Sequence, residues 1–311
     1  MEPAPAPWVP WEIWMYIIDR PELKGCSGIL RIVCKDWKKY IKSHKSHEKE
    51  AVRSVSLLSF SLSNLSLSKS RVCETAASLG NLDVLKWARK KGCMWSNTCA
   101  YTALEGHLHV LKWARENGCP WNETTCSYAA SGGHLHVLRW ARENDCPWNM
   151  LTCAYAASGG HLRILKWARE NGCHWNEYTC SSAALEGHLH ILKWVRENGC
   201  PWNIWTCSCA AKGGHLHILK WVRENGCPWN ERICAYAAKG GYFHVLKWAR
   251  ENGCPWNKDT CSNAAYSGHL HILQWARENG CPWDKYTCAC AAREAHLHVL
   301  KWARENGCPS E

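Results

Sequence analysis

The chain has 311 residues, of which 22 are Cys and 22 are Trp, and its formal net charge is +11. No stretch approaches the ~20 apolar residues of a membrane span, and the Pro/Ala-rich residues 1–10 lack the basic and apolar regions of a signal peptide. We therefore expect a protein of the cytosol or nucleus. The Arg of a recurring Trp-Ala-Arg-Glu sequence has an acidic neighbour, which predicts a mixed solvated face and argues against nucleic-acid binding.

Residues 1–42 belong to no repeat and are predicted to form two short amphipathic helices, over 11–18 and 29–41. In the second helix, apolar residues recur at helical spacing. One interpretation of this segment is a helical cap that shields the first repeat of an array, since terminal repeats need a polar outer face.

The same segment resembles an F-box. VPWE at 9–12 is similar to the family's Leu-Pro-x-Glu opening, with Val in place of Leu, and VCKDWKKYI at 33–41 is similar to its Val-Cys-x-x-Trp-x-x-x-Ile close. The resemblance implies docking on a Skp-family adaptor of a cullin–RING ubiquitin ligase. The docking surface and its core would then consist of Val9, Pro10, Ile13, Ile17, Val33 and Trp37.

Residues 43–70 are rich in Ser, which alternates with apolar residues from Ser54 to Ser70. This segment is either a linker or a degenerate first repeat, and the sequence leaves both interpretations open. Residues 71–311 form the third region, an array of repeats.

The repeats are marked by a Trp that recurs once at a spacing of 26 residues and then seven times at 27. The nine Trp residues are Trp87, Trp113, Trp140, Trp167, Trp194, Trp221, Trp248, Trp275 and Trp302. A short fixed period indicates a solenoid, in which each unit stacks on its neighbours and cannot fold alone.

One repeat, at 122–148, shows the predicted elements. Thr125 is expected to cap a short first helix over 126–130, whose paired Ala residues permit close helix approach. A second helix is expected over 134–144, with apolar residues three and four apart. Most copies end this helix with Asn-Gly, and we expect Asp145, which replaces the Gly once, to adopt the same left-handed conformation.

The Trp and Cys residues are predicted to be core. Two Trp series, represented by Trp140 and Trp148, should form buried ladders. Replacement of Trp194 or Trp221 by Ala is then expected to cost ~3–5 kcal/mol through a core cavity. Eighteen Cys residues follow the repeat pattern, and we expect them to be reduced and packed as small hydrophobic residues.

We expect no metal, no cofactor and no enzymatic activity. The two Cys positions are seven residues apart, whereas zinc sites favour ligands about two to five apart. His is also replaced in some copies, as at Arg163 and Tyr242, which a ligand position would not tolerate. Every reactive residue is copied along the array, whereas a catalytic constellation should occur once.

The repeat resembles the ankyrin repeat. TCSYAASGGHL lies where that family has Thr-Pro-Leu-His-x-Ala-Ala and Gly-His, and RENGCPWN lies where it has Glu-Asn-Gly-Ala-Asp-x-Asn. The period is shorter than the family's ~33 residues, and the missing residues fall where ankyrins extend a β-hairpin finger. The Trp/Cys-rich style is similar to that of repeats in giant DNA viruses and their protist hosts.

The resemblance implies an all-α, ankyrin-type helix-pair solenoid of about nine 27-residue repeats with shortened fingers, preceded by the small F-box-like segment. It also implies a substrate receptor that holds an unknown target protein on the repeats and links it to the ligase. A plain ankyrin-type scaffold and a basic nucleic-acid-binding solenoid are the alternatives.

Comparison of the repeats with one another indicates where a target would bind. Positions needed for stacking stay constant, whereas the pair before the Thr-Cys and the exposed side of the first helix vary. In the ankyrin resemblance these positions lie on the concave face. The predicted partner-binding residues are Tyr128, Tyr155, Tyr178, Trp205, Lys212, Arg232, Tyr236, Lys258, Tyr266 and Tyr286.

Overall fold

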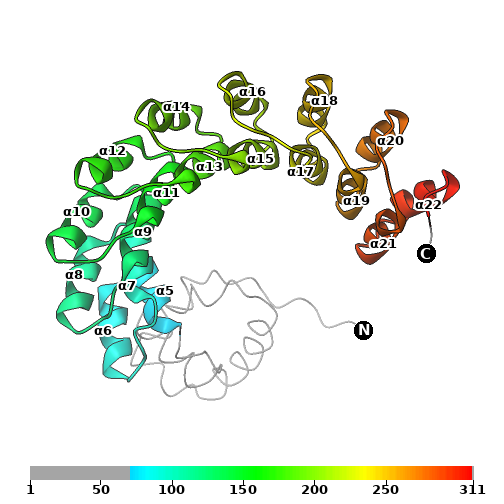
Figure 1. Cartoon of the computed structure of the whole chain (residues 1–311). Helices are drawn as coiled ribbons and strands as arrows, with labels where there is room; N and C mark the ends of the chain where they lie inside the picture. Colours follow the sequence, from blue (N-terminus) through cyan, green and yellow to red (C-terminus); the bar gives the residue numbers. More distant parts are fainter. Residues whose placement is uncertain (1–70, 310–311) are drawn as a thin grey trace, which may run out of the picture. The chain divides into compact units, whose positions relative to one another are not determined.

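The structure of the chain is a computed structural model that describes residues 71–309. The F-box-like segment, with all six predicted adaptor-docking residues, and the Ser-rich residues 43–70 lie outside the described residues. Residues 71–309 contain eighteen helices, in nine consecutive pairs, and no strand (Figure 1). The predicted all-α helix-pair solenoid is therefore confirmed for these residues. Helix and short loops occupy the positions where shortened fingers were expected.

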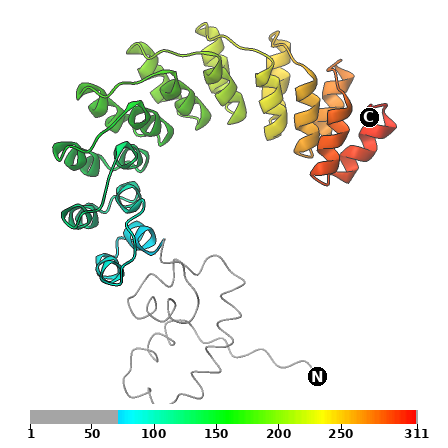
Figure 2. The ribbon, with the colours of Figure 1, turned by 60° about the horizontal axis from the view of Figure 1, so that its bottom comes forward.

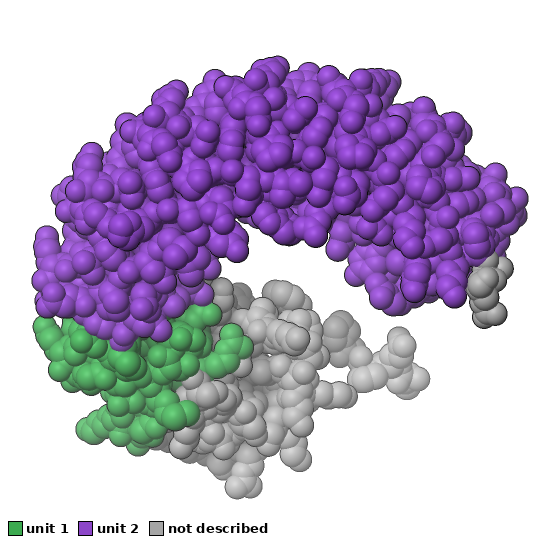
Figure 3. All heavy atoms as spheres, in the orientation of Figure 1, with its two compact units in different colours: residues 1–120 green, residues 121–311 purple. Residues whose placement is uncertain are grey.

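The described helices fall into two compact units, the first ending at Pro120 and the second beginning at Trp121 (Figure 3). The first unit contains two helix pairs: α5 (Val72–Ser78), α6 (Leu82–Lys90), α7 (Thr98–Leu104) and α8 (Leu108–Glu116). None of the helices in residues 71–309 has the length and apolar character that a membrane crossing requires.

The second unit contains seven helix pairs. The first helices of these pairs are α9 (Glu123–Ser131), α11 (Met150–Ser158), α13 (Glu177–Leu185), α15 (Ile204–Lys212), α17 (Arg232–Gly240), α19 (Lys258–Tyr266) and α21 (Lys285–Arg293). The second helices are α10 (Leu135–Glu143), α12 (Leu162–Glu170), α14 (Leu189–Glu197), α16 (Leu216–Glu224), α18 (Phe243–Glu251), α20 (Leu270–Glu278) and α22 (Leu297–Glu305).

The first helix of a repeat begins earlier than the sequence predicts. In α9 the cap is Asn122, whose side-chain oxygen accepts a hydrogen bond from the Thr124 backbone N–H at 3.0 Å. The predicted cap, Thr125, is buried inside the first turn. Asn is the stronger capping residue, so the pair that varies between repeats lies within the helix and not in a loop.

The second helix begins and ends as predicted. In α10 the flanking residues are His134 and Asn144, and Asp145 adopts the left-handed conformation with a φ of 63°. The backbone N–H of Cys146 donates to the Ala141 carbonyl at 2.9 Å, as in a Schellman motif. This bond returns the chain under the helix and places the Cys side chain in the core.

The core of the second unit consists of small and aliphatic residues. Ala129 and Ala130 on α9, and Val137 and Leu138 on α10, have no exposed surface. Because small residues line the first helices, consecutive first helices pack directly side by side, whereas consecutive second helices lie further apart (Figure 1). Unequal spacing of the two rows bends the second unit into an arc with the first helices inside, as Figure 2 also shows.

The prediction that both Trp series are buried was wrong. Trp148 and Trp167, like most of the repeated Trp residues, are only half-buried. Their rings meet edge to face with centroids 5.9 Å apart, and the Arg142 guanidinium lies 4.4 Å from the Trp148 centroid. The ladder is therefore an aromatic and cation–π layer beside the core. The space between the helices is already filled by Leu, Val, Ala and Cys, and it has no room for an indole.

The predicted burial of the cysteines is confirmed: of the described Cys residues, only Cys209 and Cys290 are half-buried rather than buried. The thiols also join the two ends of a repeat, since the Sγ of Cys173 donates at 3.3 Å to the carbonyl of Asn149, the N-cap of the first helix of the same repeat. Burial raises the pKa of the Cys73 thiol to about 12, so this residue is a protonated, unreactive thiol at neutral pH.

These environments predict the reactivity of the thiols. Brief treatment of the native protein with iodoacetamide should modify Cys209 and Cys290 before the buried cysteines among residues 71–309, as measured by peptide mass spectrometry. Protein purified without chelator should contain sub-stoichiometric zinc, since the described residues include no cluster of potential metal ligands. Rapid modification of Cys173, stoichiometric zinc, or a melting temperature that falls with chelator would contradict this prediction.

Candidate protein-binding face

The first helices of the second unit each present one face to solvent. In α13, Thr179, Cys180, Ala183 and Ala184 are buried against neighbouring helices. The residues between them in the helical wheel, such as Tyr178, remain exposed. Each repeat therefore contributes the same few helix positions to a common surface.

We call the solvent-facing residues of α9, α11, α13, α15, α17, α19 and α21 the inner face. Figure 1 shows these helices along the inner side of the arc that the second unit forms, and Figure 3 shows the hollow beneath them. All ten predicted partner-binding residues belong to these helices. The structure thus brings together residues that the sequence separates by whole repeats.

The part of the inner face formed by α9, α11 and α13 is apolar. Leu151 is 44% exposed, Tyr155 38% and Tyr178 56%, and Met150 is exposed beside them. The rings of Tyr128 and Tyr155 meet edge to face at 6.2 Å, and Tyr128 is half-buried by this contact. An aromatic pair held in this way can take up an apolar side chain without first being ordered.

A groove of about 370 Å³ crosses the inner face from α15 to α19. It contains three of the predicted residues, Trp205, Arg232 and Tyr236, and its remaining lining residues are Ala235, Asp259, Ser262 and Asn263. The Arg232 guanidinium lies 4.6 Å from the centroid of the Trp205 ring. This stacking holds a cation and an indole at fixed positions beside the groove.

Cations also lie on aromatic rings towards α21. The Tyr266 ring has Lys239 and Arg293 each 5.1 Å from its centroid. The Lys258 ammonium is 2.9 Å from the Asp284 carboxylate. The hydrogen bond and charge of that carboxylate raise the pKa of Lys258, so its ammonium stays charged near neutral pH. The exposed ring of Tyr286 lies 5.8 Å from the same ammonium.

Arg293 was missed by comparison of the repeats, although a signal for it exists. It is the last residue of α21, and Lys212 occupies the same position in α15. A cation at this position in several copies indicates a solvent-facing site at the end of the first helix. The groove residues Asn263 and Ser262 were missed as well, because small polar residues carry no sequence signal for binding. Only their packing beside residues of neighbouring helices places them in the groove.

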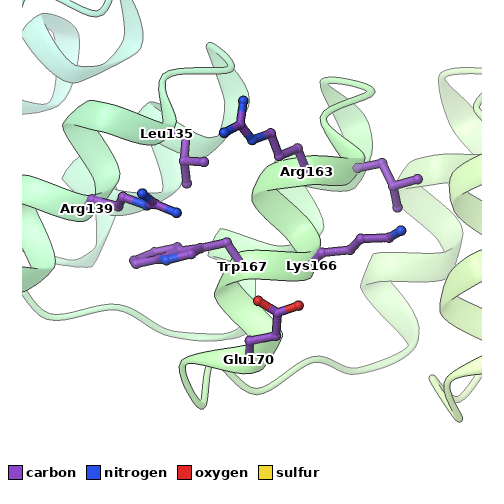
Figure 4. A pocket seen from close by; sticks show the side chains of 7 residues that line it. Leu135, Arg139, Arg163, Lys166, Trp167 and Glu170 are labelled. Carbon is purple, nitrogen blue, oxygen red and sulfur yellow. The ribbon is translucent and has the colours of Figure 1, made fainter.

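A second groove, of about 440 Å³, lies between α10 and α12 on the row of second helices (Figure 4). Arg139 extends toward the Trp167 ring, 5.6 Å from its centroid, whereas Lys166 points away and lies 5.6 Å from the Trp194 centroid of the next repeat. The same types of residue recur at the next repeat boundary. This groove is therefore a regular consequence of stacking, and the inner face, where the residues vary, is the better candidate.

No family model matches the sequence, and no curated protein is significantly similar to it. Among solved structures, the chain is similar to the crystal structure of the human ASB11 ankyrin repeat domain. The sequences are 17% identical, the match covers 50% of this chain and 84% of that chain, and the TM-score is 0.41. This likeness concerns the arrangement of helices alone.

Proposed function

We propose that the chain is a non-enzymatic protein–protein interaction protein that holds a target on the inner face. The observation that carries the proposal is the location of the exposed large hydrophobic residues. Six of the eight in residues 71–309 are on the first helices of the second unit: Met150, Leu151, Tyr155, Tyr178, Trp205 and Tyr286. Monomeric proteins rarely expose such a concentration of apolar surface without a partner, and Tyr, Trp and Arg are the commonest hot-spot residues.

Replacing Tyr178, Trp205 and Tyr236 together by Ala should abolish or strongly reduce capture of the partner. Each truncation removes exposed or half-buried aromatic surface from the inner face, at little cost to the core. The measurement is quantitative mass spectrometry of proteins cross-linked to the tagged full chain in cells, with the unfolding midpoint of the variant as a check on stability.

The matched control replaces Met94 and Leu297 by Ala, since both are at least as exposed but neither is on the inner face. Partners that disappear with the triple variant and persist with the control are those held by the inner face. An identical set of captured proteins for the triple variant and the unaltered chain would place the target elsewhere and contradict the proposal.

We further propose that the chain is a substrate receptor of a cullin–RING ubiquitin ligase in the cytosol or nucleus, of a host cell if the protein is viral. The support is the F-box resemblance of residues 1–42, which lie outside the described residues. A receptor of this kind performs no chemistry. It raises the effective concentration of its target near the transferred ubiquitin. The plain scaffold remains the alternative.

Deleting residues 1–42 should abolish capture of a purified Skp-family adaptor in a pull-down and leave the helical circular-dichroism signal of the array. The Tyr178, Trp205 and Tyr236 variant is the control, because it alters the inner face and should retain the adaptor. If the intact chain never captures a Skp-family adaptor, the receptor proposal fails and the scaffold proposal stands.

A further inference from the structure

The inner face has two halves that differ in charge. Helices α9, α11 and α13 contain no Lys or Arg, and their charged residues are Glu123 and Glu177. Helices α15, α17, α19 and α21 contain one carboxylate, Asp259, and three more flank them as cap residues: Glu231 at the N-cap of α17, and Asp284 and Glu294 at the N-cap and C-cap of α21. They contain six cations: Lys212, Arg232, Lys239, Lys258, Lys285 and Arg293.

All six cations are exposed, and two of them form ion pairs. Lys258 pairs with Asp284 at 2.9 Å, and Arg293 pairs with Glu294 at 3.1 Å. No other cation of this half has an ion pair within the described residues. This half of the inner face therefore carries an uncompensated positive charge next to the groove.

The aromatic rings keep several of these cations in place. Arg232 lies on Trp205 and Lys239 lies on Tyr266, so both charges are partly ordered before a ligand arrives. Ordered cations lose less side-chain entropy on binding than free ones. An Arg stacked on a ring also keeps its guanidinium edge available for a carboxylate, which it can bind through two parallel hydrogen bonds.

We propose that the inner face binds one protein segment that is apolar where it lies on α9, α11 and α13 and acidic where it lies on α15, α17, α19 and α21. This proposal rests on the proposed function and adds the chemistry of the target. The exposed Leu151, Tyr155 and Tyr178 would bury apolar side chains of the segment. The cations around the groove would bind its carboxylates and accelerate its association.

A nucleic acid fits this surface less well. It carries one negative charge per nucleotide along its whole length, whereas half of the inner face offers no cation and presents Glu123 and Glu177. A basic protein segment would be repelled by the other half. Only a ligand whose character changes along its length complements both halves.

The test uses fluorescence anisotropy with the full chain and three labelled probes. The first is a peptide with a block of Leu, Ala and Phe joined to a block of Glu, the second is the Glu block alone, and the third is a single-stranded oligouridine. The two-block peptide should bind most tightly at physiological salt. No detectable binding of this peptide, or tighter binding of the oligouridine, would overturn the proposal.

Two sets of variants distinguish binding of the peptide by the cations of the inner face from attraction by the net charge of the whole chain. Changing Lys212, Arg232 and Lys239 to Glu should weaken binding of the two-block peptide by at least about tenfold. The matched control changes Lys166, Lys193 and Lys220 to Glu, which alters the net charge equally but on the second helices. The control should change the affinity by less than about twofold. Equal losses of affinity in the two variants would mean that the peptide is attracted non-specifically by net charge, and they would overturn the proposal.

The apolar half is tested by changing Tyr155 and Tyr178 to Ser. Binding of the two-block peptide should weaken, and binding of the Glu block alone should not change. Failure of this inference is distinguishable from failure of the proposed function. If the Lys212, Arg232 and Lys239 variant captures cellular partners normally while the Tyr178, Trp205 and Tyr236 variant does not, the inner face is a binding site but its charge does not select the target.

Discussion

Replacing Leu219 by Ala should lower the free energy of unfolding by about 2–5 kcal/mol. Leu219 lies on α16 and is fully buried, so its truncation leaves a cavity that the stacked helices cannot close. The measurement is urea denaturation followed by far-UV circular dichroism. Because neighbouring repeats stabilise one another, a local loss in the middle of the array should also broaden or split the transition.

Trp221 on the same helix is the matched comparison. Its ring is half-buried, meets Trp202 edge to face at 5.8 Å, and has the Lys193 ammonium 6.0 Å from its centroid. Replacement by Ala removes these contacts without opening an internal cavity, so we expect a loss of about 2 kcal/mol rather than the 3–5 kcal/mol of a core Trp. A larger loss for Trp221 than for Leu219 would contradict this view of the core.

Replacing Gly160 by Ala should destabilise the chain by about 2–4 kcal/mol, because two effects combine. Gly160 has a φ of +80°, which is strained for any residue with a Cβ. An added Cβ would also lie 2.9 Å from the His188 ring of the next repeat. That ring donates through Nε2 to the Ser158 carbonyl at 3.0 Å, and displacing it breaks a bond between repeats.

Gly172 separates the two effects. Its φ is +83°, but a Cβ there would meet nothing within 4 Å. Replacement by Ala should therefore cost only the backbone strain of a residue with a Cβ at positive φ, about 1–2 kcal/mol. In a chain that already carries His188→Ala, the loss of stability caused by Gly160→Ala should fall to the loss expected for Gly172→Ala. A double-mutant cycle measures this difference. Equal effects of Gly160→Ala with and without His188 would show that the ring has no part in stacking.

The His188 contact shows one limit of sequence interpretation. Because this His position becomes Tyr242 in another copy, the sequence argues against a metal ligand there and predicts only a solvated or capping residue. In the structure, His188 contacts the carbonyl of the preceding repeat, and the Tyr242 ring occupies the equivalent place near Gly214. Both planar rings fit the space that the Gly leaves by having no side chain. The size of that space is set by the distance between repeats, which the sequence does not give.

The candidate site was largely predictable because each repeat is compared with copies of itself. Positions that stack cannot vary, so variation at Tyr178 and Trp205 marked them as solvent-facing. The groove could not be predicted, since Trp205, Arg232 and Asp259 are each 27 residues from the next in sequence. They come together only when their helices pack side by side.

The sequence by itself determined the helix-pair array, the position of the second helices and the identity of the varying surface residues. A short fixed period with apolar residues at helical spacing can bury its apolar surface only by stacking. Only the tertiary structure decided which apolar residues are core. The Ala-rich first helices pack closely and leave interior space for Leu219 but not for Trp221, whose indole lies at the margin. The same close packing curves the second unit and brings the apolar and basic halves of the inner face into one continuous row.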